Sequence, residues 1–407
     1  MNFDTPLELP CGAKLSNRLA KSGMSEHLAD VNHLPSVHLE NLYRRWSQGG
    51  SGLLITGNVM IDPRSMTASR NVVLCDGVDL EHFKRWASAG TENGNQFWLQ
   101  LNHPGRQTPR NINPSPVSAS ATDPVDLLRS VKAFASARAM NEQEIEEVIQ
   151  RFCISAAMVK AAGFTGVQIH AAHGYLINQF LSPMINKRND NWGGELVNRA
   201  RLLRTVLQRV REKVGSNYPV AVKLNSADFQ RGGLCEDETM QVIKWISEEN
   251  VDLIEISGGN YESQAMFDPA ITESTRTREA YFLDFARQAR QISSIPLMVT
   301  GGFRTASVMR EVLESGSLDV IGMARPLAAE PDLSRKIING TSQGSSYKLH
   351  SYGIKKLDFL SESGWCMAQF NRMARGKEPL LEMSAWRSLF EQLGYSITDT
   401  ISSMLQR

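Results

Sequence analysis

Residues 141–170, NEQEIEEVIQRFCISAAMVKAAGFTGVQIH, contain the repeating unit that decides the fold. In the first part, apolar residues follow the i, i+3, i+4, i+7 spacing of a helix face, at Ile145, Val148, Ile149 and Phe152. Asn141 and Glu144, just before this stripe, predict a helix start of the capping-box type, with Asn in place of Ser or Thr. The short apolar run 166–170 has the length of a buried strand. The stretch therefore predicts a helix followed by a strand.

Short apolar runs of this kind recur along the whole chain, at 18–22, 52–56, 97–102, 166–170, 220–225, 253–257, 297–301 and 319–323. Most show no alternation of polar and apolar residues, which is typical of parallel strands covered on both faces. Helical spacing recurs between them, for example at 39–46, 203–210 and 282–289. Eight strands alternating with helices predict an α/β fold. Both a closed (β/α)₈ TIM barrel and an open doubly wound sheet contain this number of strands. A TIM barrel has about 250 residues or more, a length that fits the chain as far as residue 340.

Two segments interrupt the alternation of strands and helices. Residues 104–124 contain five prolines and follow the third predicted strand, so they form a long loop, either a lid or pocket wall or a surface loop. Beyond residue 340, a polar stretch leads to an amphipathic segment at 365–375. We therefore expect a single barrel over residues 1–340 and a C-terminal helical extension over 341–407. The extension is expected to pack on the barrel or at a subunit interface, which leaves a homo-oligomer as an option.

Composition excludes several classes of protein. The 407 residues carry a net charge of +1 without a basic block, which argues against a nucleic-acid partner. The five cysteines are far apart, so no disulfide framework is predicted and a reducing compartment is favoured. Neither a signal peptide nor an apolar run of membrane-spanning length is visible. We expect a cytoplasmic protein with a small-molecule substrate and no membrane partner.

Polar residues stand at the ends of the predicted strands, where the chemistry of a TIM barrel is found. They include Gln100, Asn102, His103, Gln168, Lys223, Asn225, Asp228, Glu255 and Ser257. His170, His173 and Tyr175 fall together at a single strand end. Two neutral imidazoles can polarise a carbonyl oxygen, and a phenol is a weak acid that can release a proton. A metal site is the rival interpretation of the histidines, but a third ligand is lacking, so we predict no metal.

Two glycine-containing loops follow the last two predicted strands. The first, TGGFRT at 300–305, would present backbone N–H groups, and the second, GMARP at 322–326, adds the guanidinium of Arg325. Loops in these places are the usual phosphate site of a TIM barrel. A tight turn without a ligand would also explain the paired glycines. No G-x-G-x-x-G pattern follows the first strand, so a separate Rossmann domain is not expected.

These motifs together strongly resemble the signature of the old yellow enzyme family, the NADH:flavin oxidoreductase/NADH oxidase family that includes FMN-dependent ene-reductases. HAAHGYL at 170–176, QFLSP at 179–183 and the following Asn186, Arg188, Asp190 and Gly193–Gly194 carry the resemblance. Asn17–Arg18, QLNHPGR at 100–106 and the two phosphate loops match further motifs in the same order. The resemblance covers roughly residues 3–340.

The resemblance implies an FMN-containing barrel in which the flavin is reduced by NADH or NADPH and passes a hydride to an acceptor. Acceptors in the family include quinones, oxygen and activated alkenes. His170 and His173 would bind the acceptor carbonyl, and Tyr175 would protonate the adjacent carbon, so these three residues are both substrate-binding and catalytic candidates. The implied FMN-binding residues are Ser22, Gly23, Met24, Ser25, Gly57, Gln100, Lys223, Gly301, Gly302, Gly322, Ala324 and Arg325.

The chain departs from the common family pattern in three places. Ser25 stands where many members have Thr or Cys, after Ser22-Gly23-Met24 in place of Ala-Pro-Met. Lys223 replaces an Arg, which keeps the positive charge but loses the fork geometry. The larger iron–sulfur relatives carry clustered cysteines after the barrel, where this chain has only Cys366.

Two other functions use the same residues. The first is a non-redox barrel isomerase or lyase, in which the phosphate loops hold a phosphorylated substrate and the His/Tyr group acts as acid and base. The second is a flavin-binding protein without catalysis, which would not need the phenol.

Overall fold

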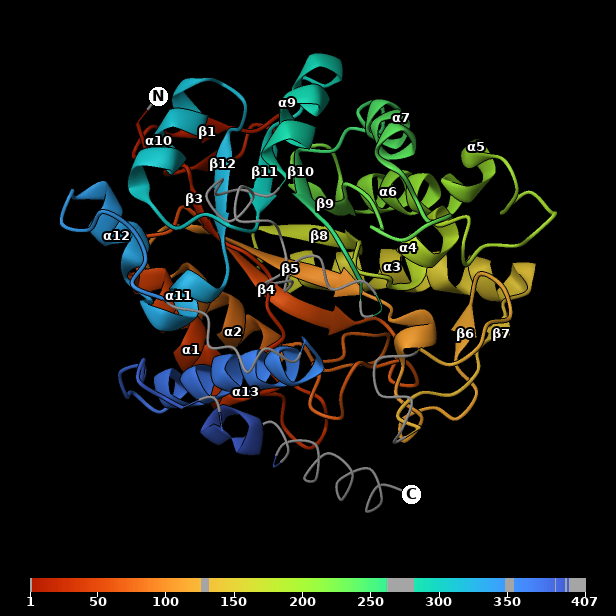
Figure 1. The fold of residues 1–407 in the computed structure, drawn as a ribbon, viewed down its shortest axis with the longest axis horizontal. Coiled ribbons are helices and arrows are strands. Elements are labelled where there is room, and N and C mark those ends of the chain that lie inside the picture. Colours follow the sequence, from red (N-terminus) through yellow and green to blue (C-terminus); the bar gives the residue numbers. More distant parts are fainter. Residues whose placement is uncertain are drawn as a thin grey trace.

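A computed structural model of the protein describes residues 2–125, 132–260, 262, 282–347, 355–384, 386–391 and 394. Eight strands form a closed barrel in the order β10-β11-β12-β3-β4-β5-β8-β9, and every neighbouring pair is parallel (Figure 1). Their bounds are β3 (Leu19–Lys21), β4 (Leu53–Met60), β5 (Gln96–Asn102), β8 (Gly166–Ala171), β9 (Val220–Asn225), β10 (Leu253–Ser257), β11 (Leu297–Thr300) and β12 (Val320–Met323). The prediction of a (β/α)₈ barrel is confirmed, and the open sheet is excluded.

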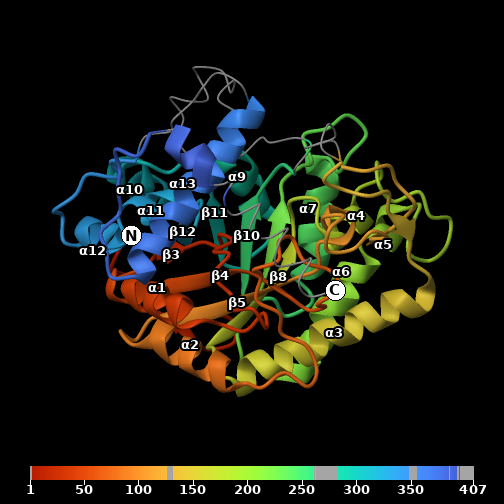
Figure 2. The ribbon, with the colours of Figure 1, turned by 90° about the horizontal axis from the view of Figure 1, so that it is seen from below.

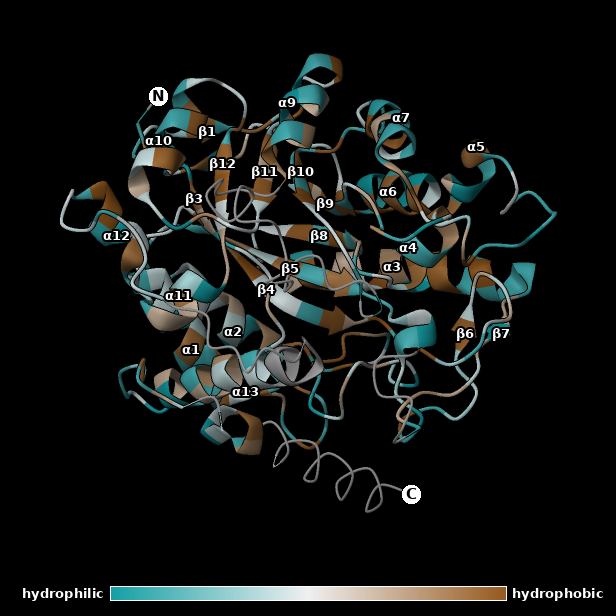
Figure 3. Cartoon of the chain, in the orientation of Figure 1, coloured by the Kyte–Doolittle hydropathy of each residue, from teal (hydrophilic) through white to brown (hydrophobic). Residues whose placement is uncertain are grey.

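The barrel is enclosed by a layer of helices (Figure 2). The longer ones are α1 (Val37–Gln48), α2 (Glu81–Thr91), α3 (Glu142–Ala161), α6 (Arg201–Val214), α7 (Glu236–Ile246), α9 (Leu283–Ile292) and α10 (Ala306–Glu314). Shorter helices are α4 (Leu176–Leu181), α5 (Leu196–Arg199), α11 (Arg325–Ala329) and α12 (Leu333–Ile338). In Figure 3 the central strands are mostly in hydrophobic colours, whereas hydrophilic stretches appear on the outer helices. This pattern places one core between strands and helices and a second core inside the barrel.

The inside of the barrel changes from apolar to polar along the strands. At the amino-terminal end it is filled by Ala20, Leu53, Ile55, Trp98, Ala221, Leu253, Met298 and Val320, together with Leu7, Leu9 and Leu15 of the N-terminal hairpin β1 (Leu7–Glu8) and β2 (Lys14–Leu15). Gly166 makes room for Trp98, because a Cβ at Gly166 would lie 2.4 Å from its Cδ1 atom. Side chains two residues further along a strand point to the same face. The strands therefore present polar residues to the interior near their carboxyl ends.

Lys21 is a buried cation on the outer face of the barrel. Its Nζ atom donates to the hydroxyl of Tyr43 and to the carbonyl of Ile55, each at 2.9 Å, and lies 4.4 Å from the ring centre of Trp46. The Tyr43 hydroxyl in turn donates to Glu26. Burial lowers the pKa of Lys21 to about 8. This cluster anchors the chain immediately before and after the segment 22–25.

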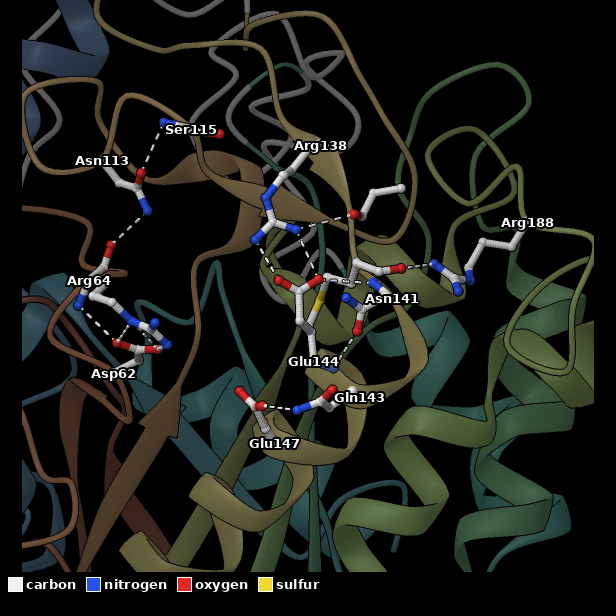
Figure 4. A network of polar contacts seen from close by, with 12 residues as sticks. Asp62, Arg64, Asn113, Ser115, Arg138, Asn141, Gln143, Glu144, Glu147 and Arg188 are labelled. Carbon is white, nitrogen blue, oxygen red and sulfur yellow. Dashed lines mark hydrogen bonds and ion pairs between the residues drawn. The ribbon is translucent and has the colours of Figure 1, made fainter.

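The predicted helix start at Asn141 is confirmed. Asn141 accepts a hydrogen bond from the Glu144 backbone N–H at 2.9 Å, and the Glu144 carboxylate accepts one from the Asn141 N–H at 2.9 Å (Figure 4). Arg138 pairs with the same carboxylate, and Arg188 donates to the carbonyl oxygen of Met140. The start of α3 is thereby tied to the chain just before it and to the segment that contains Arg188.

The structure corrects two of the predicted boundaries. Strand β4 extends to Met60 rather than ending at Thr56, and its pairing with β5 shifts register between Ile55 and Asn58. The amphipathic segment predicted at 365–375 belongs to a longer helix, α13 (Lys355–Ala374). No helix in the described part of the chain is long and apolar enough to cross a membrane.

Helix α13 lies along α1 (Figure 1). The rings of Trp46 and Phe370 meet edge to face at 5.4 Å, and the Asn41 side chain donates to the carbonyl of Ala374 at 3.2 Å. Arg45 forms an exposed ion pair with Glu378 beyond the end of α13. These contacts place α13 on the outer face of this barrel, beside the carboxyl ends of the strands.

Candidate active site

A cavity of about 280 Å³ lies at the carboxyl ends of the barrel strands. Nine of the fifteen predicted catalytic and binding residues line it, namely Gly23, Met24, Ser25, His173, Tyr175, Lys223, Gly301, Ala324 and Arg325. The lining also includes His27, Ser257, Gly258, Gly259, Asn260 and Thr300, together with Glu362, Ser363, Cys366 and Phe370 of α13. The residues singled out on five different strand ends therefore meet around a single cavity.

The backbone at His173 is held in a left-handed conformation. Its φ is 61°, its N–H donates to Asn225 Oδ1 at 3.1 Å, and its carbonyl accepts from Gln107 at 2.9 Å. The imidazole Nε2 atom is 2.9 Å from the hydroxyl of Ser257. Non-glycine residues adopt this backbone region only where the surroundings impose it. These contacts fix the imidazole at the cavity wall.

His170 and Tyr175 complete a cluster of three rings. The His170 ring centre lies 5.0 Å from that of His173 and 4.8 Å from that of Tyr175, both nearly edge to face. The backbone N–H of Ala172 donates to His170 Nδ1 at 3.2 Å, so the proton of the neutral imidazole resides on Nε2. His170 lies behind the cavity wall, whereas His173 and Tyr175 line it.

Both imidazoles are held in the neutral form. Burial, followed by the positive charge of Lys223, lowers the pKa of His173 well below its ordinary value of 6.5. Burial also lowers the pKa of His170 well below that value, with smaller contributions from His173 and Lys223. A neutral imidazole donates one hydrogen bond and carries no charge, which suits binding of a carbonyl oxygen.

Asn58 is a site residue that was missed in the sequence. Its Nδ2 atom donates to the Tyr175 hydroxyl at 3.4 Å, and its Oδ1 atom accepts from Ser25 at 2.8 Å. Asn58 thereby links the phenol to the segment 22–25. The register shift in β4 places it there, and the predicted strand ended two residues too early to include it.

A buried polar layer forms the floor beneath the cavity. Gln100 donates to Gln168 at 2.7 Å, Gln168 donates to Glu255 at 2.8 Å, and Lys223 donates to Glu255 at 2.9 Å. Gly23 lies against this layer, where a Cβ would be 2.9 Å from Gln100 Nε2. The lack of a side chain at Gly23 keeps the backbone close to the floor of the cavity.

The two predicted phosphate loops lie together at one side of the cavity. Gly301 and Gly302 have φ values of 133° and 89°, a region that favours glycine. Arg325 lines the same cavity and pairs with Glu362 at 3.2 Å. Burial raises the pKa of Glu362, and Arg325 partly opposes this. Tyr347 also donates to this carboxylate.

Six predicted site residues do not line the cavity, namely Ser22, Gly57, Gln100, His170, Gly302 and Gly322. Gly57 is packed behind Met24, since a Cβ there would meet the Met24 carbonyl at 2.3 Å. Gly322 is packed against Thr300, whose Oγ1 atom would lie 2.1 Å from an added Cβ. His103 is also away from the cavity, and burial lowers its pKa to about 4.

The loop 104–124 does not contribute to the cavity wall. All of its residues are described, and none of them lines the cavity. It contains a 3₁₀ turn, η1 (Gly105–Gln107), and strand β6 (Val117–Ser118), which pairs with β7 (Arg138–Ala139). The wall is instead completed by α13, a contribution that the amphipathic pattern at 365–375 did not reveal because such a pattern does not identify the surface it covers.

Comparison with known proteins agrees with this arrangement. The sequence model of the family described as NADH:flavin oxidoreductase / NADH oxidase matches residues 4–343. The chain is 38% identical to the NADH-dependent flavin oxidoreductase nadA of Aspergillus parasiticus over 344 residues, which are 81% of this chain and 76% of that protein.

Solved structures share the fold. The 2-naphthoyl-CoA reductase complex with 2-naphthoyl-CoA superposes with a TM-score of 0.76 at 27% identity, over 83% of this chain and 52% of that chain. This chain therefore spans about half the length of that reductase. An old yellow enzyme homologue from Zymomonas mobilis gives a TM-score of 0.71 at 23% identity, over 85% of this chain and 94% of that chain, and shows likeness of fold alone.

Proposed function

Because the chain belongs to the NADH:flavin oxidoreductase / NADH oxidase family, we propose that it is an FMN-dependent enzyme that uses NADH or NADPH to reduce a small electron-poor acceptor. The acceptor classes that the site favours are the activated carbon–carbon double bond of an enone and a quinone. The observation that carries this proposal is the cluster of His170, His173 and Tyr175, in which His173 and Tyr175 line the cavity that Lys223 and Arg325 also line, and His170 packs behind them.

The residues around the cavity fit FMN. The glycine loop at 301–302 and Arg325 provide N–H donors and a cation for the phosphate. Lys223 lines the cavity and provides a donor suited to the polar edge of the isoalloxazine ring, and Gly23 keeps the backbone close to Gln100 in the floor. When bound there, FMN would supply the chemistry of hydride transfer between NADH or NADPH and the acceptor.

The protein's own residues bind the acceptor and move a proton. The neutral imidazoles of His170 and His173 are proposed to donate hydrogen bonds to the acceptor carbonyl oxygen, which draws electron density away from the double bond. Tyr175 is proposed to transfer its phenolic proton to the carbon next to the carbonyl. Asn58 orients the hydroxyl of Tyr175 for this step.

The alternative functions are less well supported. A non-redox isomerase or lyase is not favoured, because the matched family consists of flavin oxidoreductases. A flavin carrier without catalysis would not need Tyr175 on the cavity wall.

The test of the proposal is a pair of anaerobic half-reactions. FMN-loaded protein is mixed first with NADH or NADPH and then with 2-cyclohexenone or a benzoquinone, while the flavin absorbance is followed. The protein is expected to bleach with a nicotinamide and to regain colour with an acceptor. Failure to bind FMN, or bound FMN that neither acceptor reoxidises, would overturn the proposal.

His173→Asn supplies a matched variant for acceptor binding. Asparagine tolerates the left-handed backbone at position 173 but lacks the imidazole. The variant is expected to bleach at the wild-type rate and to require a higher enone concentration for reoxidation. An unchanged enone dependence would remove His173 from the acceptor site.

We also propose a cytoplasmic location, which the five unpaired cysteines favour. The division into a barrel over 1–340 and an extension over 341–407, with α13 completing the cavity, is part of the same proposal. Self-association through the extension is the accompanying expectation, which the sedimentation velocity of the purified protein tests.

A further inference from the structure

Five strands and the residue that follows β3 contribute to a connected network of polar side chains inside the barrel, consisting of Ser22, Gln100, Gln168, Lys223, Glu255 and Thr300. All six are buried, and Glu255 and Gln168 are fully inaccessible to solvent. The network lies between the apolar residues that fill the amino-terminal end of the barrel and the cavity at its carboxyl end. It therefore forms the layer on which a molecule in the cavity rests.

Glu255 is the central hydrogen-bond acceptor of this network. Its Oε1 atom accepts from Lys223 Nζ at 2.9 Å and from Thr300 Oγ1 at 2.7 Å, while its Oε2 atom accepts from Gln168 at 2.8 Å. The contact with Lys223 follows from the sheet, because β9 and β10 pair with Lys223 opposite Glu255. Three donors converging on a side chain from different strands suit a carboxylate, which only accepts hydrogen bonds.

Lys223 is the member of the network that places a positive charge at the cavity. It lines the cavity, whereas Glu255 does not. Among the described residues that line the cavity, the other permanent cation is Arg325, in the phosphate loop. With a carboxylate 2.9 Å from the ammonium group, a molecule in the cavity meets an oriented ion pair rather than a full positive charge.

This pairing has a consequence for the flavin. Reduction by hydride transfer adds two electrons and one proton, so the ring gains one unit of negative charge. A positive charge beside the isoalloxazine ring stabilises the reduced flavin. A buried negative charge behind that positive charge weakens this stabilisation. Glu255 also fixes the ammonium group at one position on the floor of the cavity.

We propose that Glu255 is a positioning residue that holds Lys223 beneath the flavin and lowers the reduction potential of the bound cofactor. The inference rests on the proposed function, because it requires FMN in this cavity. Glu255→Gln preserves the shape and one acceptor oxygen but removes the negative charge. We expect the variant to favour reduced over oxidised FMN by about tenfold more than the wild type, the lower end of the effect of a neighbouring charge. A tenfold change corresponds to an increase of about 30 mV in a two-electron potential.

The experiment measures the midpoint potential of bound FMN by equilibration with reference dyes. Glu255→Gln should raise the potential, and Lys223→Met should lower it. Asp252→Asn is the matched control, because Asp252 immediately precedes the same strand and is a buried partner of Arg211. It lies away from the cavity, so the control should leave the potential at the wild-type value while lowering stability.

The outcomes separate this inference from the proposed function. Wild-type protein that binds no FMN would overturn both. FMN-loaded Glu255→Gln whose potential is equal to or lower than that of the wild type would overturn the role of Glu255 alone. If Glu255→Gln does not fold, Lys223→Met decides the question, since an unchanged potential without the ammonium group leaves Glu255 nothing to act through.

Discussion

Replacement of Tyr175 by phenylalanine should separate the two halves of the reaction. The phenol lines the cavity and receives a hydrogen bond of 3.4 Å from Asn58, which the variant loses. Loss of this bond should lower the free energy of unfolding by no more than about 1 kcal/mol. Loss of a general acid should slow enone reduction by about 10² to 10⁴-fold, equivalent to about 3–5 kcal/mol in the activation free energy.

The assay is stopped-flow mixing of FMN-loaded protein, first with NADH and then, after reduction, with an enone or a quinone. Flavin reduction should keep its wild-type rate, because Tyr175 has no role in that half-reaction. Enone reduction should slow, whereas quinone reduction should change little because its protons go to oxygen. Tyr218→Phe is the control, since the Tyr218 hydroxyl donates to Phe164 at 2.7 Å at a buried position outside the cavity. Equal slowing of both half-reactions, or enone reduction at the wild-type rate, would refute the role of Tyr175.

Three further changes test other parts of the structure. Between pH 8 and 10.5, Lys21 should raise the free energy of unfolding by about 3 kcal/mol. Burial lowers its pKa to about 8 in the folded state, so over this pH range only the unfolded state keeps the proton on Lys21. The free energy of unfolding of Lys21→Met, measured by urea unfolding, should not show this increase with pH. Glu362→Gln removes a carboxylate beside Arg325 and should tighten FMN binding about two- to tenfold in fluorescence titration. Weaker binding would show that Glu362 serves mainly to hold Arg325. Gly322→Ala brings a Cβ to 2.1 Å from Thr300 Oγ1, so thermal unfolding should occur at a lower temperature, and an unchanged midpoint would contradict the tight packing.

The barrel could be predicted from the sequence because its strands are buried on both faces. Strands β9 and β10 coincide with the runs predicted at 220–225 and 253–257. Strand β4 was predicted too short because Gly57 and Asn58 interrupt its apolar run after Thr56. The register shift that turns Asn58 towards Tyr175 arises from pairing with β5, and a single-strand pattern does not contain that information.

The site could be predicted as a set of residues but not as a set of contacts. His170, His173 and Tyr175 are close in sequence, so their clustering follows from one strand and one turn. The pairing of Glu255 with Lys223 requires the register between β9 and β10, which neither strand's own pattern contains, although both residues were recognised at strand ends. The approach of α13 to the cavity depends on its packing against α1, which no local spacing encodes.

The decisive measurement is the number of FMN molecules per chain that take part in both half-reactions. Protein loaded with FMN and freed of excess flavin is titrated anaerobically with NADH or NADPH and then with 2-cyclohexenone. We expect a single FMN per chain, whose colour is bleached by a nicotinamide and restored by the enone. A protein that retains no FMN, or FMN that bleaches and then fails to reoxidise with either an enone or a quinone, would contradict this expectation.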